Sequence, residues 1–235
     1  MLRGVNKNDN FKILNSLASE LKRPLILIAR QAELNKVRAD KNHFQSIQET
    51  AEKSLKLIDS YLLMAQSEYG QQLLPVESFG VGSVIYSVAE QIRPIAKKAK
   101  IDVVLNVSDA PVMANREGLK AVIWCLTDMV LAQTSSERGS GIIEINTRKS
   151  TSGVKVSVLS KSMKVKNSDL QKAQRNLGKT HMALSLSSSE SGVRLAIASL
   201  LGESLGTSLQ AVRSNRTQGI GFNLVLSSQL QLGIK

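Results

Sequence analysis

Apolar side chains in the first third of the chain recur at intervals of three and four residues. The spacing holds over residues 8–38 and again over 43–68, and it is typical of amphipathic α-helices. The apolar positions are Phe11, Leu14, Leu17, Ala18, Leu21, Leu25 and Ile28, then Phe44, Ile47, Ala51, Leu55, Ile58, Leu62 and Ala65. Because residues 38–42 between them are polar, the pattern predicts an antiparallel two-helix hairpin.

The pattern changes after residues 70–82, which contain Gly and Pro and predict a boundary between domains 1–70 and 71–235. We expect helices over 80–98, 115–134 and 193–206, and strands over 101–109, 141–149, 153–160, 208–212 and 219–228. Residues 161–190 are polar and weakly periodic, which predicts a mobile loop with room for a helical piece. The predicted fold class is α+β: the hairpin, a four-helix bundle when dimeric, followed by an α/β sandwich.

Composition narrows the class of protein. With 42% hydrophobic residues the chain can bury a core, and the single cysteine, Cys125, excludes an internal disulfide. No apolar run reaches the roughly 18 residues that span a bilayer, and residues 1–10 have no apolar core typical of a signal peptide. We therefore expect a cytoplasmic protein without membrane insertion. The net charge of +12 keeps binding to nucleic acid or another polyanion open, although aromatic residues make up only 3%.

Several segments, taken in order, resemble the motifs of one family. "SELKRPL" (19–25) is similar to His-Glu-Leu-Arg-Thr-Pro-Leu, and "ANREGLKAVIWCLTDMVLAQT" (114–134) to an Asn-box helix. "VSVLSKSMKV" (156–165) stands where the family has Val-x-Val-x-Asp-x-Gly-x-Gly-Ile, and "SGVRLAIASLL" (191–201) resembles its Gly-Leu-Gly-Leu-Ala-Ile helix. Over about residues 8–228 the chain thus resembles a sensor histidine kinase core. The resemblance implies a dimerising phosphoacceptor hairpin followed by an ATPase domain of the GHKL type.

The resemblance places Ser19 at the acceptor position, with Glu20 at the assisting acid and Pro24 at the proline of that motif. A serine hydroxyl is a poor nucleophile unless a base activates it. Glu20 is badly placed for this, because neighbouring helical side chains point about 100° apart. We expect the two histidines, His43 and His181, to be ordinary polar residues, so no catalytic residue is predicted.

The Asn-box asparagines of the family correspond to Cys125 and Met129, whose sulfur atoms are poor ligands for magnesium. Asp128 supplies a carboxylate, but one residue out of phase it should point about 100° away. Ser160 stands where the family has the aspartate that accepts a hydrogen bond from adenine.

The glycines that let the backbone approach the nucleotide correspond to Ser162 and Lys164. The last glycine motif keeps Gly192, while Arg194 stands at another of its positions and would attract phosphate. We therefore expect no metal site, no nucleotide site and no cofactor. Weak binding of ATP with magnesium stays open.

The motif positions have changed while the packing positions are intact, which favours a degenerate histidine kinase, or pseudokinase. We expect a homodimer, or a dimer with a related kinase, that regulates or scaffolds signal transduction without phosphotransfer. Its partner would be a response-regulator-like or kinase protein, with Lys22, Arg23 and Arg30 as candidate contacts. Two alternatives remain: an active kinase or ATPase of this family with an unorthodox site, and a basic module that binds nucleic acid or another polyanion.

Overall fold

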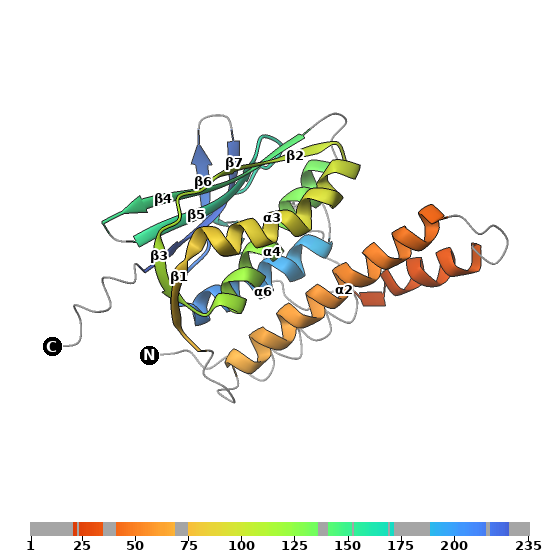
Figure 1. The fold of residues 1–235 in the computed structure, drawn as a ribbon, viewed down its shortest axis with the longest axis horizontal. Helices are drawn as coiled ribbons and strands as arrows, with labels where there is room; N and C mark the ends of the chain where they lie inside the picture. Colours follow the sequence, from red (N-terminus) through yellow and green to blue (C-terminus); the bar gives the residue numbers. More distant parts are fainter. Residues whose placement is uncertain are drawn as a thin grey trace.

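The protein is layered, with a β-sheet, three helices beneath it and a helical hairpin below those (Figure 1). A computed structural model describes residues 21–22, 24–34, 41–68, 75–135, 141–151, 153–168, 170–171, 189–214 and 217–225; side chains of 41–43, 67–68 and 189–191 are not described. The described residues contain no helix with the length and hydropathy needed to cross a membrane.

The main sheet has five strands in the order β2 (Ile101–Asn106), β4 (Gly141–Ser150), β5 (Gly153–Ser160), β7 (Thr217–Leu224) and β6 (Gln210–Ser214). The first pair is parallel and the other three pairs are antiparallel. The prediction of one mixed sheet is therefore confirmed. The turn between β4 and β5 uses Gly153, whose φ of 142° lies where side chains are strained.

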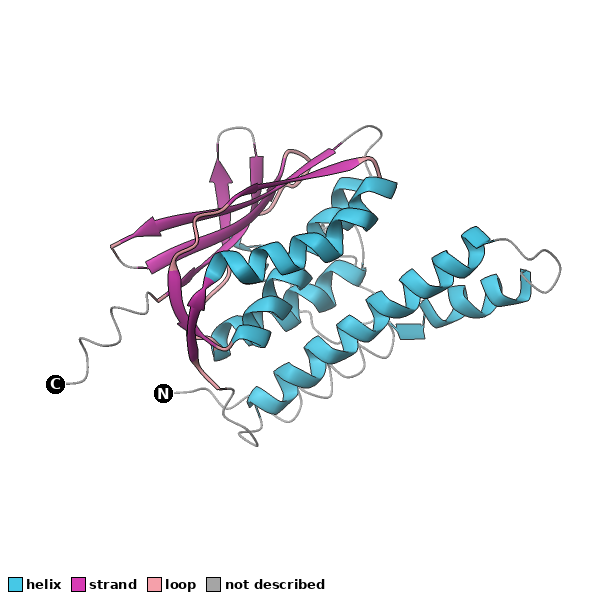
Figure 2. Ribbon diagram, viewed as in Figure 1, coloured by secondary structure: helices cyan, strands magenta, loops and turns pink. Residues whose placement is uncertain are grey.

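One face of this sheet is covered by α3 (Val81–Lys98), α4 (Arg116–Ser135) and α6 (Ser189–Ser204) (Figure 2). Fourteen of the twenty residues of α4 are buried, because the helix packs against both the sheet and its neighbours α3 and α6. This burial explains why the apolar residues of α4 are not confined to one stripe. The predicted α/β sandwich is confirmed.

The hairpin consists of helical residues 24–34 and α2 (Lys41–Glu68). The two segments lie side by side (Figure 1), and Gln31 Nε2 donates a hydrogen bond to Ser46 Oγ at 2.9 Å between them. In its C-terminal half, α2 packs against α4 and α6.

The face that α2 buries differs from the predicted one. Leu57, Ser60 and Met64 are buried, whereas Leu55 and Leu62, from the predicted stripe, are exposed. The periodicity was correct, but α2 carries apolar residues on two sides, and the side centred on Leu57 and Met64 is the one that meets α4 and α6.

Two short strands lie in segments for which no strand was predicted. β1 (Glu77–Gly80) and β3 (Pro111–Ala114) form a separate antiparallel pair. Neither segment, ESFG or PVMA, alternates apolar and polar residues as the pattern for a strand requires. Within the expected loop 161–190, residues 167–168 and 170–171 are helical and α6 already begins at Ser189, while 172–188 lie outside the described residues. The proposed domain boundary at residue 70 also lies outside them.

Candidate functional site between the hairpin and helix α4

Helix α4 is anchored at its first turn. Asn115 Oδ1 accepts a hydrogen bond from the Gly118 backbone N–H at 2.7 Å, which caps the helix. The Asn115 amide also donates to the Pro75 carbonyl at 2.8 Å. These bonds tie the start of α4 to the chain before β1, and the next three turns carry the candidate site.

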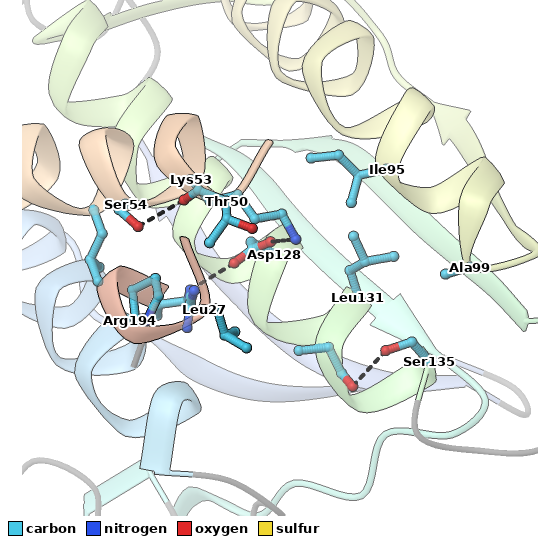
Figure 3. Close-up of a pocket in the computed structure, with 13 residues that line it drawn as sticks. Leu27, Thr50, Lys53, Ser54, Ile95, Ala99, Asp128, Leu131, Ser135 and Arg194 are labelled. Atoms are coloured by element: carbon cyan, nitrogen blue, oxygen red, sulfur yellow. Dashed lines mark hydrogen bonds and ion pairs between the residues drawn. The ribbon is translucent and has the colours of Figure 1, made fainter. Parts of the chain in front are cut away.

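Asp128, on α4, is the charged centre of the site (Figure 3). Its carboxylate forms an ion pair with Arg194 Nε of α6 at 2.7 Å and lies 3.7 Å from Lys53 Nζ of α2. The Asp128 side chain is only 4% exposed, that of Arg194 12% and that of Lys53 35%. Three helices are thus joined by one carboxylate. The short contact lies inside the unit formed by the two sheets with α3, α4 and α6 (the described residues from 75 to 225, called the ATPase-like unit below), and the looser contact reaches the hairpin.

A cavity of about 310 Å³ opens beside these charges. Figure 3 shows the side chains around it. The hairpin contributes Pro24, Leu27, Thr50, Lys53, Ser54 and Leu57. The rest of the lining is Ile95 of α3 and Ala99, which caps it, Asp128, Leu131, Ala132 and Ser135 of α4, and Arg194 of α6. The cavity is therefore an interface cavity between the hairpin and the ATPase-like unit.

Cys125 and Met129 are fully buried in the core. Burial raises the pKa of the Cys125 thiol to about 12, although the Arg194 charge and a hydrogen bond with Ser60 of α2 oppose the shift. Ser60 therefore lies directly against the Cys125 position. Helix α2 covers the part of α4 that the family resemblance assigns to magnesium.

Ser160 is fully buried, and its hydroxyl is hydrogen-bonded to that of Thr134 at 3.0 Å. The Ser162 backbone N–H donates to Ser160 Oγ at 3.3 Å, while Lys164 is exposed. Gly192 is buried near the start of α6. Among the nucleotide-motif positions that the structure describes, only Arg194 lines the cavity.

On the hairpin, Pro24 lines the cavity, and Lys22 and Arg30 are exposed. Ser19, Glu20, Arg23 and His181 lie outside the described residues, and His43 is in the first turn of α2 without a described side chain. Acceptor and partner-contact roles on the hairpin therefore remain predictions.

Asp128 lines this cavity, and Arg194 forms an ion pair with it. The expectations that Asp128 points away from a magnesium site and that Arg194 attracts phosphate stay predictions. Sequence analysis missed Lys53 and Ser60. The sequence does place Lys53 and Ser60 on the same helix face as Leu57 and Met64, because these four residues recur at intervals of three and four.

The residues at these positions do not fit a magnesium–nucleotide complex. Magnesium needs oxygen ligands, whereas Cys125 and Met129 offer sulfur inside a packed core. The nearest carboxylate, Asp128, already neutralises Arg194. Within the described ranges no three His, Cys, Asp or Glu side chains are grouped to hold a metal ion.

A scan against models of known protein families found no match, and neither did a search of curated protein sequences. Solved structures do match. The histidine kinase AdeS of Acinetobacter baumannii superposes with a TM-score of 0.62 at 16% identity, over 88% of this chain and 98% of its own. ShkA, solved full-length with AMPPNP, gives 0.55 at 15%, over 90% of this chain and 46% of its own.

A structure described as a bacterial phosphotransferase also matches, with a TM-score of 0.53 at 12% identity, over 93% of this chain and 98% of its own. The described chain therefore has the fold of a histidine kinase core, including the mixed sheet and helices of its ATPase domain. At these identities the likeness concerns the fold.

Proposed function

We propose that this chain is a histidine-kinase-like pseudokinase that acts as a regulatory or scaffold protein in signal transduction. The observation that carries the proposal is the placement of α2 across α4. Ser60 lies against Cys125 and Lys53 lies beside Asp128. The family resemblance puts Cys125 and Met129 at the metal-binding positions, so in this proposal the hairpin covers that part of α4.

Charge supports the same proposal. The carboxylate and the guanidinium closest to this face, those of Asp128 and Arg194, satisfy each other at 2.7 Å. A nucleotide phosphate that recruited Arg194 would leave Asp128 buried without its counter-ion, at a cost of several kcal/mol, on the order of that for any broken buried pair. The pair therefore favours a closed structural role over phosphate binding.

The hairpin also supports association with a second copy. Large apolar side chains remain exposed along it, and side chains of this kind are typical of protein interfaces when they gather in one region. They are Leu25, Ile26, Leu27, Leu34, Phe44, Leu55 and Leu62. We propose a homodimer through this surface, with Lys22 and Arg30 available to an acidic protein partner.

The test is incubation of the purified chain with γ-³²P-ATP and magnesium, alone and with a kinase core of the same fold as a positive control. We expect neither labelled protein nor released phosphate. A magnesium-dependent label on the chain would contradict the proposal and favour the active-kinase alternative. Substitutions of Ser19, His43 and His181 by alanine would then locate the acceptor.

The phosphotransferase match favours a second candidate, because that structure spans almost the whole of this chain and of itself. In this alternative the chain receives a phosphoryl group from another protein without using ATP. Incubation with a ³²P-phosphorylated receiver domain tests it. Label that moves to the chain, and is lost in His43→Ala or His181→Ala, would support phosphotransfer; label that stays on the donor would exclude it for that donor.

A further inference from the structure

The cavity between the hairpin and α4 has a chemistry of its own. At about 310 Å³ it falls at the lower end of the range for small-molecule pockets, about 300–1,000 Å³. Its walls are mostly apolar: Leu27 and Leu57 come from the hairpin, Ile95 from α3 and Leu131 from α4. A ligand of matching shape would therefore bury an apolar body.

The charges at the cavity leave an excess of one positive unit. Its charged lining residues, within the part of the chain that the structure describes, are Lys53, Asp128 and Arg194. Arg194 and Asp128 form the short pair at 2.7 Å. Lys53 lies 3.7 Å from the same carboxylate, too far for a hydrogen bond, so its ammonium is the loosely held cation of the site.

The hydroxyl groups around the cavity do not offer their hydrogen atoms to an anionic ligand. Those of Thr50, Ser54 and Ser135 donate to backbone carbonyls of their own helices, at 2.7, 2.8 and 3.0 Å; Figure 3 shows the bonds of Ser54 and Ser135. They remain acceptors of hydrogen bonds, and acceptors do not attract an anion. Lys53 is therefore the group at the cavity that would favour an anionic ligand over a neutral one.

We propose that this cavity binds a small monoanionic amphiphile, such as a medium-chain carboxylate, with its head group on Lys53 and its apolar body among Leu27, Leu57, Ile95 and Leu131. Such a ligand would contact the hairpin and the ATPase-like unit together, so its binding would hold the two in contact. The regulatory meaning of this site rests on the proposed function; the binding itself does not.

Calorimetric titration of the full chain with octanoate tests the site. We expect a dissociation constant of about 1 mM or lower, from a favourable free energy of roughly 0.4 kcal/mol per non-hydrogen atom. Octanol, which has the same body without the charge, should bind about fivefold more weakly. Equal affinity for octanol and octanoate, or no binding of octanoate, would overturn the proposal.

Variants locate the binding. Lys53→Gln should weaken octanoate binding about fivefold, whereas Lys97→Gln, at an exposed position on α3, should leave it unchanged. Ala132→Leu places a larger apolar group in the cavity and should abolish binding. An unchanged affinity in Lys53→Gln would overturn the assignment even if Ala132→Leu fails to fold.

Cys125 reports on the coupling, because α2 covers it. Labelling of its thiol requires the hairpin to open, so octanoate at ten times its dissociation constant should slow labelling about tenfold. An unchanged rate would contradict the coupling. Phosphoryl transfer from ATP would refute the proposed function. It would not affect the proposal that the cavity binds octanoate, which the titration tests separately.

Discussion

Asp128 has an almost completely buried carboxylate held by cations from two other helices. A buried charge is costly unless it is paired, so the pair with Arg194 is a condition for the fold of this region. Sequence analysis identified Arg194 as a motif position and Asp128 as a carboxylate one residue out of phase with the motif. It could not predict their contact, because helical phase fixes a direction on each helix and not the distance between two helices.

We expect Asp128→Asn to lower the free energy of unfolding by about 3 kcal/mol, because Arg194 loses its counter-ion while remaining mostly buried. Lys53→Gln should cost less than about 1 kcal/mol, since Lys53 is partly exposed and its contact is long. Urea unfolding of the two variants measures both. Equal losses would show that the short and long contacts do not differ as the structure indicates.

The buried thiol of Cys125 predicts a pH dependence. Its pKa is about 12 in the folded chain and 9.0 as the ordinary value, so the folded state holds the proton more tightly. The thiol's contribution to stability is therefore complete below pH 9 and is lost as pH rises from 9 toward 12, by up to about 1.4 kcal/mol per pH unit.

Urea unfolding of the wild type and of Cys125→Ala across this pH range isolates the effect, because lysines and tyrosines titrate in both proteins. The wild type should lose stability more steeply with pH than the variant. Parallel curves would mean that the thiol is accessible to water in the folded chain.

At the scale of elements, α2 carries two apolar sides with different partners. Met64 is buried, whereas Leu62, two residues earlier, is exposed. At protein concentrations low enough for the chain to be monomeric, we expect Met64→Ala to lower the free energy of unfolding by about 2–5 kcal/mol and Leu62→Ala by less than about 0.5 kcal/mol. The reverse order, measured by urea unfolding, would mean that α2 presents its other face to α4 and α6.

The sequence predicted those elements whose pattern is long enough to show a period. Apolar and polar residues alternate over 143–146 in β4 and over 154–158 in β5, and α3 has one clear apolar stripe. β1 and β3 were missed because their four residues show no period. The packing of α2 on α4 was missed for another reason: amphipathicity identifies a face to be buried but not the element that buries it.

At the scale of the whole molecule, the hairpin has one side against the ATPase-like unit and one side with exposed apolar residues. We expect the full chain to sediment as a dimer at micromolar concentration, because a second copy would cover Leu55 and Leu62. The double variant Leu55→Glu/Leu62→Glu should sediment as a folded monomer, with Met64 packing intact. A monomeric wild type at all accessible concentrations would contradict the homodimer.

The central proposal is that the hairpin closes the part of α4 that the family resemblance assigns to the metal and nucleotide. Calorimetric titration of the wild-type chain with ATP, with and without magnesium, tests it most directly. The account predicts no heat of binding at millimolar ATP in either condition. Saturable binding that strengthens with magnesium would contradict it, because the cation would then have found oxygen ligands that Cys125, Met129 and the paired Asp128 do not supply.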